Sequence, residues 1–109
     1  MTTFTHWRFH IDQQNIGCLE LDVAGTSVNI LQREVMREWA EIMDNLIKVE
    51  ELAGLCLLSG KKRGFIYGAD IAEFDELKTK ADVHESIELA DTILSGIEAL
   101  DCPTVCGID

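Results

Sequence analysis

The sequence is poor in proline, in basic residues and in long hydrophobic runs. One proline and eight glycines among 109 residues exclude a collagen-like or linker-rich chain. No apolar run approaches the roughly 20 residues that a membrane-spanning helix needs. The N-terminal segment MTTFTHWRFHIDQQ has no basic stretch followed by an apolar one, so no secretory signal is predicted. We therefore expect a cytoplasmic protein without a membrane span.

Basic residues are scarce: nine lysines and arginines stand against twenty aspartates and glutamates, for a net charge of -11. Nucleic-acid binding needs a basic face that neutralises phosphates, so this function is not expected. The four cysteines form no CxxC pair and show no zinc-finger spacing. Cys18 and Cys56 lie in apolar runs, where a buried thiol is the usual interpretation. The sequence predicts neither a disulfide framework nor a metal site.

Hydrophobic residues make up 47% of the sequence, enough for one compact domain over residues 1–109. Alternating apolar and polar residues predict two strands joined by a polar turn, and hence an antiparallel hairpin. Apolar residues three and four apart predict helices farther along. In order, the expected elements are strands at 6–11 and 16–23, a helix at 31–48, a strand at 53–58, a short helix from Asp70, a helix from Asp82 and a strand from Thr104.

The helix that follows Asp82 is expected to bury one apolar stripe. Asp82 and Glu85 have the spacing of a capping box at a helix start, as do Asp70 and Glu73. Strands separated by helices favour parallel pairing through right-handed crossovers, and so an α/β sheet covered by helices. The predicted stripe consists of Val83, Ile87, Ala90, Leu94 and Ile97.

One segment, GKKRGFIYGADIAEF at 60–74, gathers three of the nine basic residues just ahead of Gly68-Ala69-Asp70. It fits neither the P-loop spacing nor the GxGxxG fingerprint of dinucleotide-binding proteins. Gly68 permits a sharp turn and a close approach of a ligand. A rigid, unpaired Ala69 N–H beside a positive helix end could stabilise negative charge on an oxygen. An ordinary capped turn is the alternative that the spacing leaves open.

Three stretches resemble the crotonase, or enoyl-CoA hydratase/isomerase, superfamily. LLSGKKRGFIYGADIAEF, at 57–74, is similar to the family's buried strand, Ser-Gly turn and Gly-Ala-Asp-Ile-x-Glu-Phe motif. LELDVAGTSVNILQREVMREW, at 19–39, looks like its strand, Asn-containing loop and first helix. IEALDCPTVCGID, at 97–109, looks like its approach to the next strand. The loop at 25–29 is most similar to the hydratase domain of multifunctional β-oxidation proteins.

This resemblance implies a crotonase-like ββα spiral, of which the chain is the N-terminal portion only, and an acyl-CoA thioester as substrate. It implies that two backbone N–H groups hold the thioester carbonyl, and that Ala69 supplies the first of them. Tyr67 stands where the family commonly has a small or aliphatic residue, so the pocket should differ there. The residues that the resemblance places near CoA are Ser27, Asn29, Ile30, Lys61, Tyr67, Gly68, Asp70 and Ile71.

The resemblance also implies that the second oxyanion donor and the catalytic glutamates follow Asp109, so the chain alone is expected to be inactive. Hydration of an enoyl-CoA needs two placed carboxyl groups, and Glu73 is interpreted as a cap rather than a base. Hydration needs no cofactor, because coenzyme A is part of the substrate; NAD is implied only if a dehydrogenase domain follows.

The expected partners are further copies of the protein or a thiolase-containing complex. Two kinds of alternative remain open at this point. One is another activity of the superfamily, such as that of an isomerase, a thioester hydrolase or a dehalogenase. The other is a non-catalytic assembly module.

Overall fold

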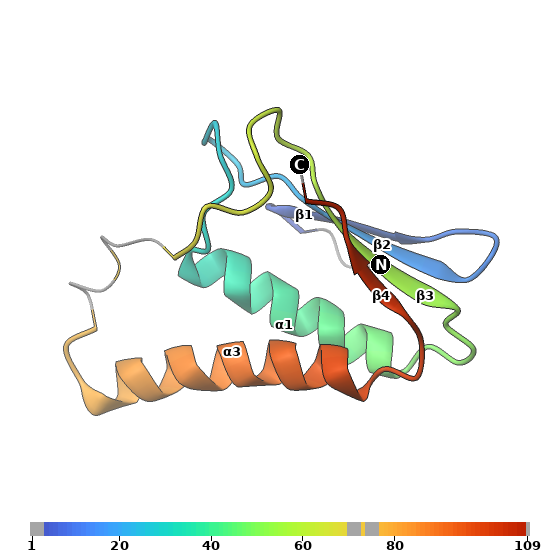
Figure 1. Cartoon of the computed structure of the whole chain (residues 1–109). Coiled ribbons are helices and arrows are strands. Elements are labelled where there is room, and N and C mark those ends of the chain that lie inside the picture. Colours follow the sequence, from blue (N-terminus) through green and yellow to red (C-terminus); the bar gives the residue numbers. More distant parts are fainter. Residues whose placement is uncertain (1–3, 70–72, 74–76, 109) are drawn as a thin grey trace.

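A computed structural model of the chain describes residues 4–69, 73 and 77–108, in which helices cover one face of a four-stranded sheet (Figure 1). The elements are β1 (Trp7–Ile11), β2 (Ile16–Leu21), α1 (Arg33–Ile47), β3 (Gly54–Ser59), α3 (Lys80–Ala99) and β4 (Thr104–Cys106). Their types and order confirm the prediction. The short helix predicted from Asp70 falls mostly outside the described residues.

The predicted hairpin is present, since β1 and β2 pair antiparallel with Trp7 opposite Leu21. Its turn is organised by the Asp12 side chain, whose Oδ1 accepts hydrogen bonds from the N–H groups of Gln14 at 2.8 Å and Ile16 at 3.0 Å. An aspartate that bonds the backbone two and four residues on favours a turn over a continued strand. The polar segment between the two strands therefore acts as the predicted turn.

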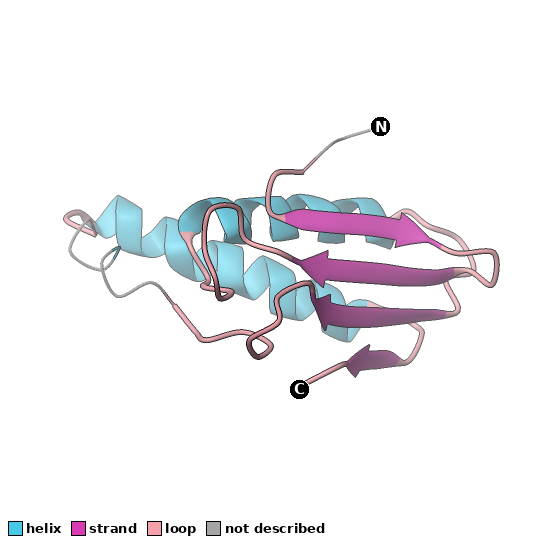
Figure 2. Cartoon of the chain, turned by 90° about the horizontal axis from the view of Figure 1, so that it is seen from above, coloured by secondary structure: helices cyan, strands magenta, loops and turns pink. Residues whose placement is uncertain are grey.

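The sheet has the order β1-β2-β3-β4, and its last three strands are parallel. Helix α1 connects β2 to β3 and helix α3 connects β3 to β4, so each parallel pair is joined by a crossover helix. Figure 2 shows both helices on the same side of the sheet. The predicted α/β architecture is confirmed. Parallel pairing also brings the carboxyl ends of β2 and β3 to one edge of the sheet.

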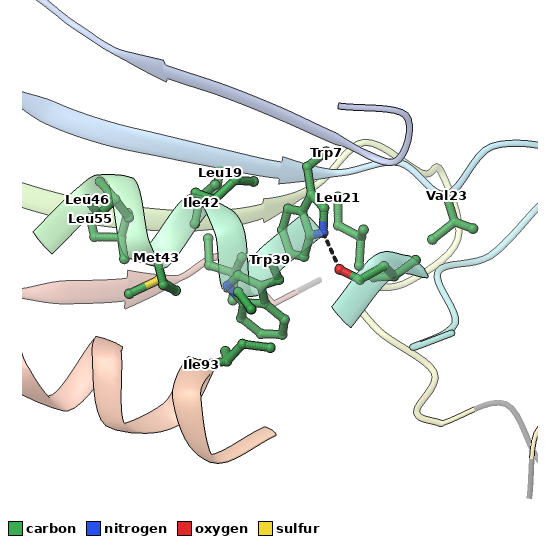
Figure 3. Packing of buried hydrophobic residues seen from close by; sticks show 13 residues of the cluster. Trp7, Leu19, Leu21, Val23, Trp39, Ile42, Met43, Leu46, Leu55 and Ile93 are labelled. Atoms are coloured by element: carbon green, nitrogen blue, oxygen red, sulfur yellow. Dashed lines mark hydrogen bonds between the residues drawn. The ribbon is translucent and has the colours of Figure 1, made fainter. Parts of the chain in front are cut away.

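The core lies between the sheet and α1, and α3 covers α1 from the other side (Figures 1 and 3). The Trp7 indole N–H donates to the Val35 carbonyl at 3.0 Å, and the Trp7 ring centroid lies 5.0 Å from that of Trp39. This bond satisfies a buried donor that would otherwise be costly. The buried residues of α1 are Val35, Trp39, Ala40, Ile42, Met43 and Leu46.

The predicted stripe of α3 is wrong in three of its five positions, because Val83, Ile87 and Leu94 are exposed. The buried residues are Ile93 and Gly96. A Cβ added at Gly96 would lie 3.2 Å from the Met43 Cε, so this glycine allows α3 to approach α1 closely.

The start of α3 also differs from the prediction. Its N-cap is Thr79, whose hydroxyl accepts from the Asp82 N–H at 3.1 Å, so the helix begins before the predicted Asp82. Farther along, Arg37 of α1 meets Glu85 at 2.6 Å and so links the two helices. This hydrogen bond, despite a smaller opposing effect of burial, raises the pKa of Arg37 above its usual value.

Candidate active site

Two loops that leave the carboxyl ends of β2 and β3 meet at one end of the sheet (Figure 1). The Tyr67 N–H donates to the Asn29 carbonyl at 2.8 Å, and the Leu31 N–H donates to the Gly68 carbonyl at 2.7 Å. A regular parallel ladder would pair Leu31 with the Tyr67 carbonyl, so Gly68 is an extra residue in the pairing. Its φ of +116° is one that residues with a side chain rarely adopt. Gly68 therefore makes the turn that the sequence predicted.

These bonds determine the direction of the Ala69 N–H. The Gly68 carbonyl and the Ala69 N–H belong to one trans peptide group, so they point in opposite directions. Because the carbonyl is bonded to Leu31, the N–H points away from that loop. Ala69 is exposed, and among the residues that the structure describes its N–H has no hydrogen-bond acceptor. Within the described part of the chain, the N–H has the outward direction that the sequence predicted for it.

Ala69 also borders a mainly apolar cavity of about 170 Å³. The cavity lies where the first turn of α1 and the first half of α3 approach the Ala69 turn. The sequence reasoning missed most of its lining, although Ser86, Leu89, Ile93 and Gly96 repeat at helical spacing and could have indicated the inward face of α3. The lining residues are Leu31, Arg33, Met36, Ala69, Glu73, Leu77, Ser86 and Leu89.

Glu73 lines this cavity but is occupied as a helix cap. Both of its carboxylate oxygens accept from the Arg33 N–H, at 2.9 and 3.1 Å. Arg33 is the first residue of α1, and the N-cap residue Gln32 provides no side-chain cap. A carboxylate at this position satisfies an otherwise unpaired N–H and lies at the positive end of the helix. A capping role for Glu73 is present at the start of α1, whereas the short helix predicted from Asp70 lies mostly outside the described residues.

Asn29 is 0% exposed, and its amide is bonded entirely within the protein. Its Oδ1 accepts from the Val23 N–H at 3.1 Å. Its Nδ2 donates to the Leu21 carbonyl at 2.9 Å, the Ser59 Oγ at 2.9 Å and the Phe65 carbonyl at 3.0 Å. The expectation that Asn29 contacts CoA is therefore wrong. Its side chain connects the ends of β2 and β3, through hydrogen bonds, to the loop that leads to Ala69.

Lys61 is likewise engaged within the protein. Its Nζ lies 2.7 Å from Asp22 Oδ1 and donates to the carbonyls of Val23 at 2.7 Å and Thr26 at 2.6 Å. The side chain is only 12% exposed, and these three acceptors match the three N–H donors of an ammonium group. The contact of Lys61 with CoA stays a prediction; the neighbouring Lys62 and Arg63 are exposed.

The other predicted CoA-binding residues lie around the same turn. Ser27 is exposed and Ile30 is half-buried, both on the loop after β2. Tyr67 is 62% exposed, and its ring lies over Gly64, where an added Cβ would come within 2.7 Å of the Tyr67 Cε1. Asp70 and Ile71 are outside the residues that the structure describes.

The described residues contain neither a candidate membrane span nor a candidate metal centre. No helix there is long and apolar enough to cross a membrane. No group of three or more histidine, cysteine, aspartate or glutamate side chains in residues 4–69, 73 and 77–108 is arranged to hold a metal ion.

The sequence is similar to that of alpha subunits of the fatty acid oxidation complex. The chain is 33% identical over 96 residues to the subunit of Shewanella oneidensis and 34% identical over 93 residues to that of Shewanella baltica. These alignments cover 88% and 85% of this chain, but only 14% and 13% of the two relatives. No family model matches the sequence.

Solved structures share the fold. A putative enoyl-CoA hydratase from Streptomyces coelicolor superposes with a TM-score of 0.83 at 16% identity, over 99% of this chain and 39% of the other. A putative enoyl CoA hydratase/isomerase (crotonase) from Legionella pneumophila gives 0.82 at 17%, over 98% and 41%. This chain has the crotonase fold. The crotonase fold predicted from the sequence is thereby confirmed, and the chain spans about two fifths of these crotonase-fold structures.

Proposed function

We propose that this chain is the acyl-CoA-binding N-terminal part of a crotonase-fold enoyl-CoA hydratase of fatty-acid β-oxidation. The observation that supports the proposal best is the direction of the Ala69 N–H, which points away from its own loop at the border of an apolar cavity. The sequence similarity to fatty acid oxidation complex alpha subunits supports the choice of pathway.

In the proposed reaction the thioester carbonyl oxygen accepts a hydrogen bond from the Ala69 N–H. As water adds to the double bond, electrons move onto this oxygen, and a fixed donor stabilises the growing negative charge. Such a donor is effective because Gly68 and Leu31 hold its peptide group before the substrate arrives. The cavity beside Ala69 would take the apolar acyl chain. A second N–H and the carboxyl groups that move protons would come from other parts of the intact enzyme.

Glu73 is a poor candidate for one of those proton-transferring groups. It is the one carboxylate among the cavity-lining residues that the structure describes, yet both of its oxygens face the Arg33 N–H. A general base must reach the proton that it removes. We therefore assign Glu73 to holding α1 against the turn, which positions the cavity wall.

The CoA portion would lie across the two loops. The pantetheine and adenine would be flanked on one side by Ser27 and Ile30. On the other side they would be flanked by Tyr67, Gly68, Asp70 and Ile71. Because Lys61 is bonded to Asp22, the phosphates would meet Lys62 and Arg63, which are exposed. Hydration would need no cofactor, and NAD would be needed only with a dehydrogenase domain. The intact protein would work in the cytoplasm, as a homo-oligomer or in a thiolase-containing complex.

The proposal is tested in a longer protein that carries this chain, by removing the Ala69 N–H. Ala69→Pro, or replacement of the Ala69 amide by an ester, should lower kcat for crotonyl-CoA hydration by about 10²–10³-fold, the usual effect of losing one oxyanion donor. The matched control Ala69→Ser keeps the N–H and changes an exposed side chain, so it should retain most of the activity. Circular dichroism confirms that each variant is folded. Full activity in the folded ester variant would contradict the proposal.

A further inference from the structure

Cys18 and Cys56 lie directly opposite each other on neighbouring parallel strands. They are Cα partners in the pairing of β2 with β3. Adjacent strands lie about 4.7–4.9 Å apart, and disulfides form at Cα separations of about 4.4–6.8 Å. Residues in register also point their Cβ atoms to the same face of the sheet. The backbone therefore holds the two thiols at a separation that a disulfide can span.

The helices leave one face of the sheet uncovered (Figure 2). Both cysteines alternate along their strands with core residues: Cys18 precedes Leu19, and Cys56 stands between Leu55 and Leu57. Side chains alternate between the two faces of a sheet, so the thiols point away from α1. Both are free and half-buried, which leaves them within reach of a small oxidant.

We propose that Cys18 and Cys56 form a redox modification site, at which a peroxide converts the dithiol to a disulfide across β2 and β3. One thiolate attacks hydrogen peroxide, which yields a sulfenic acid and water. The second thiol attacks the sulfenic sulfur, the S–S bond forms, and a second water leaves. In total two thiols and one peroxide give one disulfide and two waters, with two electrons passing from sulfur to oxygen. This inference does not depend on the proposed hydratase function.

The surroundings of Cys18 favour the reduced state of the pair, in which both cysteines are thiols. Burial raises the pKa of the Cys18 thiol, and the neighbouring Cys56 and Asp12 raise it further. A raised pKa lowers the thiolate fraction at neutral pH, so the first step is slow and needs an oxidant in excess. Once a sulfenic acid has formed, the opposite thiol is already in place to resolve it.

The same geometry predicts that the disulfide is reversible. Cβ atoms of residues in register on parallel strands are about as far apart as the strands themselves, about 4.8 Å, whereas a relaxed disulfide has them about 3.8 Å apart. Closing the bond must draw β2 and β3 together, and strained disulfides are the more easily reduced ones. Dithiothreitol should therefore restore both thiols quickly without unfolding the chain.

The test treats the native chain with hydrogen peroxide and maps disulfides by mass spectrometry without reduction. A Cys102→Ser, Cys106→Ser background removes the other two thiols and leaves only the pair. We expect the peptide of Cys18 linked to that of Cys56, a monomeric product, and the loss of two titratable thiols per chain. If the background variant folds poorly, the chain with all four cysteines is mapped in the same way and should show the same link between Cys18 and Cys56.

A matched control moves one thiol along β3 while keeping it on the same face. Leu58 lies two residues beyond Cys56, so Cys56→Ser with Leu58→Cys places the thiols on a diagonal beyond disulfide reach. This variant should cross-link at least about tenfold more slowly than the native pair. Sulfinic acids or intermolecular disulfides in place of the Cys18–Cys56 link would overturn the proposal. Equal cross-linking rates in the native pair and the control variant would also overturn it. The same holds for equal rates in the folded chain and in urea, because the strand register would then play no part.

Discussion

At the scale of single residues, Asn29 connects segments that are far apart in the sequence. Its amide bonds to Leu21 and Val23 at the end of β2, to Ser59 at the end of β3 and to Phe65 in the following loop. The two N–H groups of Nδ2 are shared among three acceptors, so no donor is left for a ligand. The Ala69 turn begins two residues after Phe65, at Tyr67, whose N–H the Asn29 carbonyl accepts. Asn29 thus stabilises the loops that carry the candidate site.

We predict that Asn29→Leu destabilises the chain by at least about 2 kcal/mol. Leucine has a similar volume but leaves the buried Val23 N–H and the part-buried Phe65 carbonyl without a partner, and each such group costs about 1–3 kcal/mol. The Leu21 carbonyl keeps its bond from the Gly60 N–H. Urea denaturation followed by tryptophan fluorescence measures the change. The control Asn45→Ala removes an exposed amide on α1 and should change stability by no more than about 0.5 kcal/mol. Equal losses of stability in the two variants would contradict this structural role of Asn29.

The sequence indicated which segments meet at the candidate site, but not the orientation of two side chains there. Gly68 and Ala69 were predictable, because a positive φ and an outward N–H follow from local backbone geometry. The contacts of Lys61 with Asp22, Val23 and Thr26 depend instead on a loop more than thirty residues earlier in the chain. No local pattern distinguishes Lys61 from Lys62, and only the fold reveals which lysine is engaged.

At the scale of elements, the first helix and the hairpin were predictable, whereas the inward face of α3 was not. α1 has one continuous apolar stripe and charged residues elsewhere, so its buried face is unambiguous. α3 has apolar residues on two faces, with Val83, Ile87 and Leu94 on one and Leu89, Ile93 and Ile97 on the other. Gly96 favours the second face, because the absence of a side chain there lets Met43 of α1 approach α3 closely.

We predict that two identical substitutions on α3 differ sharply in their effect. Ile93 is 1% exposed and packs beneath Trp39, whereas Ile87 is 62% exposed (Figure 3). Ile93→Ala should cost about 2–5 kcal/mol through lost burial and the cavity left behind. Ile87→Ala should cost less than about 1 kcal/mol, since alanine also has the higher helix propensity. Urea denaturation of both variants measures the difference, and a greater loss in Ile87→Ala would restore the stripe first predicted from the sequence.

At the scale of the whole molecule, the chain brings the loops after β2 and β3 to one edge of the sheet and places a cavity beside them. An α/β protein binds ligands at the carboxyl ends of its parallel strands, next to helix N-termini, and this edge has both features. The fold could be predicted because the order of elements and the motif at 57–74 agree with each other. What the fold adds is the cavity, whose lining comes from three separated parts of the chain.

We predict that the 109-residue chain alone does not hydrate crotonyl-CoA above the uncatalysed rate. One N–H donor contributes about 2.7–4 kcal/mol to transition-state stabilisation, and each proton-transferring carboxyl group adds about 10²–10⁴-fold in rate. Ala69 can supply the first contribution, but Glu73, beside the cavity, is held by the Arg33 N–H. The assay follows loss of the enoyl absorbance, with a longer protein containing this chain as the active control. If the short chain hydrates crotonyl-CoA and Glu73→Gln abolishes this turnover, Glu73 must leave its cap and act as the base. The division of roles proposed here would then be wrong.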